Sequence, residues 1–171
     1  MRSLLIASIL LTLPACQKGL SAANPHGADH PLVGAPAPAF ELTQFGGDAV
    51  AGPSHTQGKV TLIDFWATWC EPCRDSFPVY DAIAKEYGDD LVIIAISEDE
   101  EPNGIAAFHE QTNVSFPVYW DEGQRVAKDY DPPTMPTSYL VDRAGIVRYV
   151  HVGFNAGDEA TLRSQISALI D

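Results

Sequence analysis

The chain has 171 residues, of which 46% are hydrophobic and 19% charged, and its formal net charge is −13. A chain of this length forms one good hydrophobic core, so we expect a single domain with a single active site. The acidic balance, which no cluster of lysine and arginine offsets, repels phosphate backbones and argues against a nucleic-acid partner.

Residues 1–16 have the pattern of a secretory signal peptide: Arg2 supplies positive charge, Leu4 to Leu13 is an apolar run, and Leu13-Pro14-Ala15-Cys16 follows. The apolar run is far shorter than the ~20 residues that span a bilayer as a helix, which argues against a permanent transmembrane anchor. The ending resembles a bacterial lipoprotein processing site, in which Cys16 becomes the acylated first residue. We expect export to the bacterial periplasm or cell envelope, either with a lipid on Cys16 as the only membrane contact or after plain cleavage nearby.

Residues 17–38 are rich in Ala, Gly, Pro and Asn, and we interpret them as a tether between the anchor point and the fold. We place the folded domain at residues 32–171. At its start, the alternating Phe40 and Leu42 and the turn-forming Gly46-Gly47-Asp48 predict an N-terminal hairpin or edge extension.

The remaining chain alternates between strand-like and helix-like patterns. Strands are predicted at residues 60–66, 91–96, 116–120, 137–141 and 146–152. Helices are predicted from the cysteines to Gly88, at residues 102–112 and 124–130, and from Asp158 as N-cap to the C-terminus. The segment 116–130 reads as an inserted strand and helix. This order predicts an α/β fold, a three-layer α/β/α sandwich with a mixed central sheet.

Two of the three cysteines lie in the run Trp69-Cys70-Glu71-Pro72-Cys73, between the strand 60–66 and the helix that follows. Reactive groups of such sheets gather at the carboxyl ends of strands. A helix N-terminus stabilises a thiolate, so Cys70 is predicted to be the attacking thiol. Cys73, one turn inside the helix and less exposed, is predicted to resolve the mixed disulfide. Pro72 suits the first helical turn.

Glu71 lies between the two cysteines. At roughly 7 Å in a water-like dielectric its charge disfavours the thiolate by ~0.6 kcal/mol, which is worth about 13 mV toward a more reducing couple. Two other interpretations of the cysteine pair are that it forms half of a zinc site or that it forms a structural disulfide. His109 and His151 show no metal-ligand spacing, and a bridge over so short a loop constrains little. We therefore expect redox catalysis without a metal or cofactor.

The run from Val60 to Cys73, with Gly58-Lys59 before it, Pro78 after the second cysteine and Met135-Pro136-Thr137 before a strand, resembles the thioredoxin superfamily. Within it, the run is similar to the exported TlpA/ResA-like thiol-disulfide oxidoreductases with an AhpC/TSA-Redoxin-type domain. The resemblance covers roughly residues 32–171 and implies a thioredoxin-like fold. It also implies that Pro136 is cis and faces the cysteines, so that the backbone of Met135 can pair with an extended substrate strand.

Asp64 occupies the place of the buried acid that, in thioredoxins, helps to deprotonate the second cysteine. An acid in an apolar strand is costly unless it has a role, and burial raises its pKa toward a useful range. We interpret Asp64 as a proton relay for Cys73; the alternative is a carboxylate at the strand edge that water reaches. Many of the similar reductases carry a glutamate where this chain has Ser76. The residues expected to shape the site are Trp69, Glu71, Pro72, Met135 and Pro136.

The leading functional hypothesis is that a monomer reduces disulfides in exported partner proteins, for example in cytochrome c maturation or envelope redox homeostasis. Its partners would be oxidised or reduced thiol proteins and a membrane thiol electron donor. Two alternatives stay open. A thiol-dependent peroxidase of the related peroxiredoxin group would carry Thr or Ser three residues before the reactive cysteine, where this chain has Ala67. A non-catalytic, lipid-tethered copper- or partner-binding module would space its cysteines by three residues.

Overall fold

The structure is a computed structural model in which residues 29–171 are described. The predicted signal peptide, Cys16 and the part of the predicted tether before Asp29 lie outside the described residues. No helix within residues 29–171 combines the length and the hydrophobicity that crossing a membrane requires.

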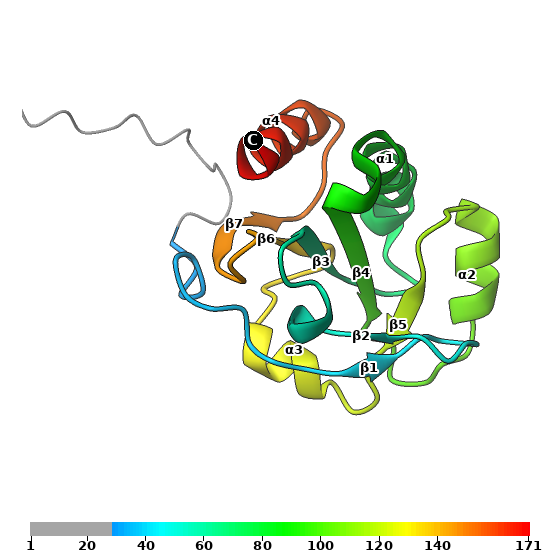
Figure 1. Ribbon diagram of the computed structural model, residues 1–171. Helices are drawn as coiled ribbons and strands as arrows, with labels where there is room; N and C mark the ends of the chain where they lie inside the picture. Colours follow the sequence, from blue (N-terminus) through cyan, green and yellow to red (C-terminus); the bar gives the residue numbers. More distant parts are fainter. Residues whose placement is uncertain (1–28) are drawn as a thin grey trace, which may run out of the picture.

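The centre of the fold is a mixed five-stranded sheet in the order β5-β4-β3-β6-β7 (Figure 1). Its strands are β3 (Val60–Trp66), β4 (Leu91–Ser97), β5 (Val118–Trp120), β6 (Thr137–Val141) and β7 (Val147–Val152). Strands β3, β4 and β5 are parallel, whereas β6 runs antiparallel to β3 and β7 antiparallel to β6. The two central strands are buried on both faces, which explains their nearly continuous apolar sequences. The predicted mixed central sheet is confirmed.

Helices cover both faces of this sheet (Figure 1). The helices are α1 (Glu71–Tyr87), α2 (Ile105–Thr112), α3 (Arg125–Tyr130) and α4 (Asp158–Ile170), with single 3-10 turns at Pro53–His55 and Gly88–Asp90. Leu62 and Trp66 of β3 pack with α1, α2 and α4, whereas Ile63 and Phe65 pack with α3 and the N-terminal segment. The alternation of side chains along β3 therefore divides the core into two layers, as the three-layer sandwich predicts.

The N-terminal extension forms the predicted hairpin from β1 (Leu42–Thr43) and β2 (Val50–Ala51). Before the hairpin, Gly34 donates its N–H to Val147 of β7 at 2.8 Å, and after β1, Phe45 donates to Val118 of β5 at 2.9 Å. The extension thus covers both edge strands, which protects their backbone groups from pairing with other chains. The predicted tether (17–38) and the predicted domain (32–171) overlap at residues 32–38. In the structure these residues pack as part of the domain.

Several element boundaries differ from the prediction by one to three residues, and three of them have a clear local cause. The helix expected at residues 102–112 begins at Ile105, because Gly104 has a φ of 94° and ends a turn there. The strand expected at residues 116–120 begins at Val118, after Pro117, which has no N–H for the ladder. Asp158 is the first residue of α4, not its N-cap, and its carboxylate accepts the backbone N–H of Asn155 at 2.7 Å.

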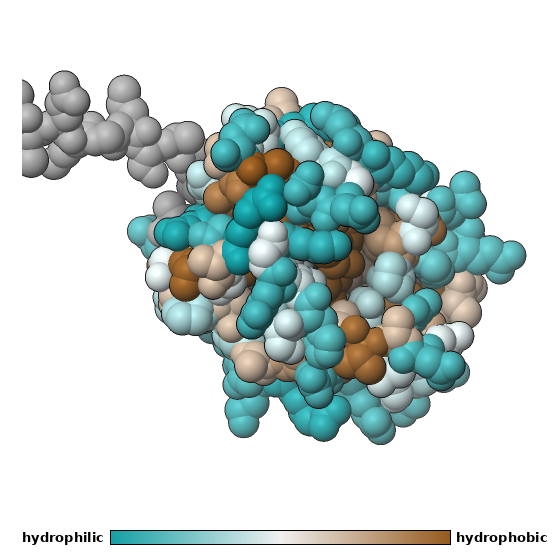
Figure 2. Space-filling model, viewed as in Figure 1, coloured by the Kyte–Doolittle hydropathy of each residue, from teal (hydrophilic) through white to brown (hydrophobic). Residues whose placement is uncertain are grey.

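Exposed hydrophobic side chains are few on the visible surface. The face shown in Figure 2 is mainly hydrophilic, and its hydrophobic side chains form separate patches. Among the described residues, the large hydrophobic side chains with the greatest exposure are Trp69 at 72% and Val50 at 45%. Trp69 directly precedes Cys70, so the most exposed large hydrophobic side chain adjoins the cysteine pair.

Candidate active site

The loop between β3 and α1 presents Cys70 as the N-cap of α1. Its backbone is extended, with φ −83° and ψ 105°, as is usual for the residue that opens a helix. The Cys70 Sγ accepts the backbone N–H of Cys73 at 3.2 Å. The two sulfurs form a disulfide across a Cα–Cα distance of 5.3 Å. Pro72 lies in the first turn of α1, where a helix needs no N–H.

The two cysteines differ in their access to the surface. Cys73 is fully buried and Cys70 is 3% exposed, while Trp69 projects into solvent. Both sulfurs belong to a core cluster that includes Trp66 and Phe77. Of the two cysteines, Cys70 is therefore the more exposed, and it directly follows the exposed Trp69.

A positive side chain lies in the first turn of α1 next to the pair. The guanidinium of Arg74 lies 4.5 Å from the ring centroid of Phe108, donates to Gln111 Oε1 at 3.0 Å, and has its Nε 4.0 Å from the exposed carboxylate of Glu71. Exposed pairs of this kind are weak, but the positive charge offsets the effect expected of Glu71 on a neighbouring thiolate. Sequence reasoning missed Arg74, because its role depends on contacts with α2.

Asp64 lies at the middle of the central strand β3, opposite Ala95 on one side and Ser138 on the other. It is fully buried, so the alternative of a water-reached carboxylate at a strand edge is wrong. No hydrogen bond of normal geometry within residues 29–171 reaches either of its oxygens, although the Tyr80 hydroxyl faces them. Burial raises the pKa of Asp64 well above its usual range, and the facing Tyr80 hydroxyl lowers it only in part.

Tyr80 connects Asp64 to the helix that carries the cysteines. It lies two turns after Cys73 on the same face of α1, and both pack into the same buried cluster. Burial and then the charge of Asp64 raise the Tyr80 pKa well above its usual range. Ser76, between them, donates its hydroxyl to the Cys73 carbonyl at 3.1 Å. The sequence analysis did not single out Tyr80, since only the fold shows that it faces Asp64.

Asp99 fixes the loop that precedes Cys70. Its carboxylate accepts the backbone N–H of Thr68 at 3.0 Å, the Thr68 hydroxyl at 2.7 Å and the Ser97 hydroxyl at 2.7 Å. The Asp99 side chain is buried, so these bonds are shielded from water. Sequence reasoning missed this residue. The available signal was an acidic run that directly follows the apolar strand β4, at the sheet edge where the cysteines lie.

The segment before β6 contains the predicted cis bond, between Met135 and Pro136. Met135 is half-buried and packs against the cluster that holds Cys70 and Cys73, while Pro136 is buried. Met135 therefore packs against the core layer that holds the cysteines. That Pro136 faces the cysteines and that the Met135 backbone pairs with a substrate strand stay predictions.

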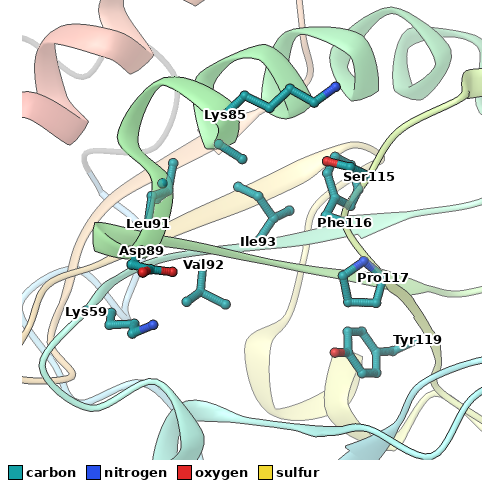
Figure 3. A pocket seen from close by; sticks show the side chains of 12 residues that line it. Lys59, Lys85, Asp89, Leu91, Val92, Ile93, Ser115, Phe116, Pro117 and Tyr119 are labelled. Atoms are coloured by element: carbon teal, nitrogen blue, oxygen red, sulfur yellow. The ribbon is translucent and has the colours of Figure 1, made fainter.

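A hollow lies at the end of β3 and β4 that is opposite the disulfide. Lys59, Lys85, Asp89, Leu91 and Tyr119 are among its lining residues, and its volume is about 290 Å³ (Figure 3). Lys59 precedes β3 and Leu91 begins β4, whereas Cys70 follows the end of β3. This hollow is therefore separate from the disulfide. Within residues 29–171, no group of three His, Cys, Asp or Glu side chains is placed to hold a metal ion.

A thioredoxin-like sheet with a disulfide at the N-terminus of its first long helix defines a class of thiol-redox proteins. Residues 33–150 match the model of the AhpC/TSA family, and the chain belongs to that thioredoxin-like family.

Named relatives agree with this assignment. The Bacillus subtilis thioredoxin-like protein YneN is 33% identical over 123 residues, which are 70% of this chain and 71% of YneN. The thiol-disulfide oxidoreductase ResA of the same species is 31% identical over 155 residues, 89% of this chain and 86% of ResA. A Chlorobium tepidum structure described as thiol:disulfide interchange protein DsbE has a TM-score of 0.77 and 35% identity, and the match covers 81% of this chain and 98% of that one.

Proposed function

We propose that the protein is a thiol-disulfide oxidoreductase that reduces disulfides in exported partner proteins. The observation that carries the proposal is the Cys70–Cys73 disulfide at the N-terminus of α1, in which the more accessible sulfur accepts a helix N–H. Unpaired N–H groups and the helix dipole stabilise a thiolate at this position, and the thiolate is the form that exchanges with disulfides.

The reaction begins with both enzyme sulfurs reduced. The Cys70 thiolate attacks one sulfur of a partner disulfide; the partner S–S bond breaks, a Cys70–partner S–S bond forms, and the leaving thiolate takes a proton. The Cys73 thiolate then attacks the Cys70 sulfur, the mixed disulfide breaks, and the partner's second thiol leaves. Two electrons have moved to the partner, and the enzyme holds the Cys70–Cys73 disulfide. An external dithiol, which we place at the membrane, returns it to the reduced form.

Three further residues support these steps. Asp64 acts as the proton relay for Cys73: a buried carboxyl with a raised pKa accepts the thiol proton when Cys73 attacks. Tyr80, which faces Asp64, lies on the Cys73 face of α1 and packs in the same buried cluster. The backbone of Met135, directly before β6, pairs with an extended segment of the partner and presents its disulfide to Cys70.

The cellular setting follows from the N-terminal sequence. We propose export through the signal at residues 1–16 and anchoring by a lipid on Cys16, with the domain working as a monomer. Support comes from the short apolar run and the Leu-Pro-Ala-Cys ending. In a bacterial host fed radiolabelled palmitate, the protein is expected to carry label in the membrane fraction, whereas Cys16→Ala is expected to be unlabelled. A labelled Cys16→Ala, or an unlabelled parent protein, would contradict the anchor.

The activity is tested by reduction of insulin with dithiothreitol as the electron source. The protein is expected to accelerate precipitation of the insulin B chain, and Cys70→Ser is expected to abolish the acceleration. Lys59→Gln, at the far end of β3, is the control and should retain it. Rapid peroxide consumption without insulin reduction would instead establish a peroxidase.

A further inference from the structure

A pocket of about 300 Å³ adjoins the Met135 segment on the α3 side of the sheet. It lies between the carboxyl end of β4, helix α3 and the chain that leads into β6. Its lining residues are Glu98, Gln124, Ala127, Lys128, Asp131, Pro132 and Met135. The pocket is therefore next to the backbone that we propose to pair with the partner polypeptide.

Glu98 is an acid without a partner in the wall of this pocket. It is 3% exposed, and no hydrogen bond from the described part of the chain reaches either carboxylate oxygen. Ile94 and Ile96 of β4 pack in the core layer on the α3 side, and Glu98 continues this alternation two residues later. Its side chain thus belongs to the face of the sheet on which the pocket lies. Buried polar groups of native proteins normally have a partner, and the ionised carboxylate of Glu98 lacks a hydrogen-bond donor.

The charges around Glu98 specify the donor. Asp121 uses its carboxylate on the first N–H groups of α3, including that of Val126 at 2.7 Å, and Asp99 is occupied by Thr68 and Ser97. Burial, then Asp121 and then Asp99, raises the pKa of Glu98 to about 8. A neutral donor would leave this negative field uncompensated, and an anion would be repelled. A cation satisfies both the hydrogen bonds and the charge.

We propose that this pocket binds a lysine or arginine side chain of the partner polypeptide, close in sequence to the partner's reacting cysteine. The inference rests on the proposed function, because the partner segment is placed by the Met135 backbone. Ala127, Pro132 and Met135 offer apolar surface to the aliphatic stem, and Glu98 receives the charged end. Asp131 adds negative charge, whereas Lys128 is the one lining residue that opposes a cation, and it is exposed.

Disulfide-linked peptides test the subsite. A peptide carries lysine at one of the two positions on either side of its cysteine, and a matched peptide carries glutamine there. The rate constant for reduction by the dithiol form of the protein is measured for each. At the correct position, lysine or arginine is expected to be preferred over glutamine by about tenfold, which corresponds to about 1.4 kcal/mol.

For each variant we compare the preference for lysine over glutamine, not the absolute rate constant. Glu98→Gln keeps the shape of the side chain but not its charge, and should reduce the preference to about twofold or less. Lys128→Gln should raise it by about twofold, since the competing cation is gone. Glu122→Gln removes an exposed acid that does not line the pocket, and should leave the preference unchanged.

The pH dependence of the lysine preference provides a further test, because a purely structural role of Glu98 would not change it. A cation binds ionised Glu98, so the lysine preference should rise with pH and level off above about 8. The lysine ammonium keeps its proton up to about pH 10, and the ionisation of Cys70 is common to both peptides, so neither produces the rise. Asp99, Asp121, Asp131 and Lys128 are the other charged groups facing Glu98, and Glu98→Gln retains them. The rise should therefore disappear in that variant.

The outcomes separate this inference from the proposed function. Equal rates for all peptides, or a preference that Glu98→Gln retains, would overturn the subsite and leave the oxidoreductase intact. If no peptide is reduced, the proposed function fails, and the subsite fails with it. If Glu98→Gln does not fold, the parent protein and the Lys128→Gln variant provide the test. A lysine preference that does not change with pH in the parent, together with no increase of that preference in Lys128→Gln, overturns the subsite.

Discussion

The Sγ atom of Cys70 accepts a hydrogen bond from the backbone N–H of Cys73 at 3.2 Å. The residue that we propose to resolve the mixed disulfide thus also stabilises the sulfur that forms it. Because the contact comes from the backbone, replacing the Cys73 side chain leaves the donor in place. A helix N–H directed at a sulfur favours its thiolate, so Cys70 should remain reactive without Cys73.

This relationship gives the first prediction. After incubation with a disulfide-containing protein, Cys73→Ser should accumulate a mixed disulfide through Cys70, whereas Cys70→Ser should accumulate far less, because Cys73 is fully buried. Mass spectrometry of the unreduced products measures both adducts. Equal trapping by the two variants, or more through Cys73, would reverse the assigned roles.

The second prediction concerns the stability contributed by Asp64. Burial raises its pKa in the folded protein, so the folded state holds the proton more tightly than the unfolded state does. That contribution is complete below the unfolded pKa of about 3.9 and is lost as pH rises through the raised folded pKa. Asp64→Asn has no such group, so its free energy of unfolding should fall measurably less between pH 4 and pH 9 than that of the parent protein.

Urea denaturation at several pH values measures this difference, and Asp89→Asn, at an exposed position, is the control that should follow the parent protein.

A kinetic test of Asp64 is the rate at which the partner is released from the Cys70 mixed disulfide. Asp64→Asn should slow this release about tenfold or more, as loss of a general base does. An unchanged release rate would remove Asp64 from the mechanism while leaving it as a buried acid.

The third prediction concerns Asp99, which holds the loop before Cys70. Asp99→Ala leaves the Thr68 N–H, the Thr68 hydroxyl and the Ser97 hydroxyl without their acceptor, and should lower the free energy of unfolding by about 3 kcal/mol. Asp99→Asn keeps one acceptor oxygen and should recover part of the loss. Glu100→Ala, at the exposed neighbour, should change stability by no more than about 0.5 kcal/mol. Equal stability of Asp99→Ala and Glu100→Ala would show that the loop needs no such support.

The fourth prediction concerns Trp69. Because this side chain is 72% exposed, Trp69→Ala should leave the free energy of unfolding within about 0.5 kcal/mol of the parent value. We propose that this exposed aromatic side chain beside the reactive sulfur contacts the partner, so the rate constant for partner reduction should fall by about tenfold. Val50→Ala, at the other exposed large hydrophobic residue, is the matched control. A similar loss in both variants would argue against a contact between Trp69 and the partner.

The sequence was sufficient to predict the order of elements, because strands such as Val60–Trp66 and the helix ended by Gly88 have clear patterns of hydrophobicity and chain-breaking residues. It also identified the cysteine pair, since the spacing is local. The parts it missed depend on contacts between distant segments. Arg74 meets Phe108 of α2, and Asp99 meets Thr68, 31 residues earlier in the chain. Glu98 is notable only because the fold buries it beside Asp121 and leaves it without a partner.

The reduction potential of the Cys70/Cys73 couple tests the central claim most directly. It is measured by equilibrating the protein with thiol buffers of known potential and alkylating the free thiols. A reductase of exported disulfides should give a value of about −270 mV or lower, as strongly reducing members of this chemistry do. Glu71 and Arg74 oppose each other beside the pair, so neither charge alone should move the value far. A value of about −120 mV would identify an oxidant and contradict the proposed direction of electron flow.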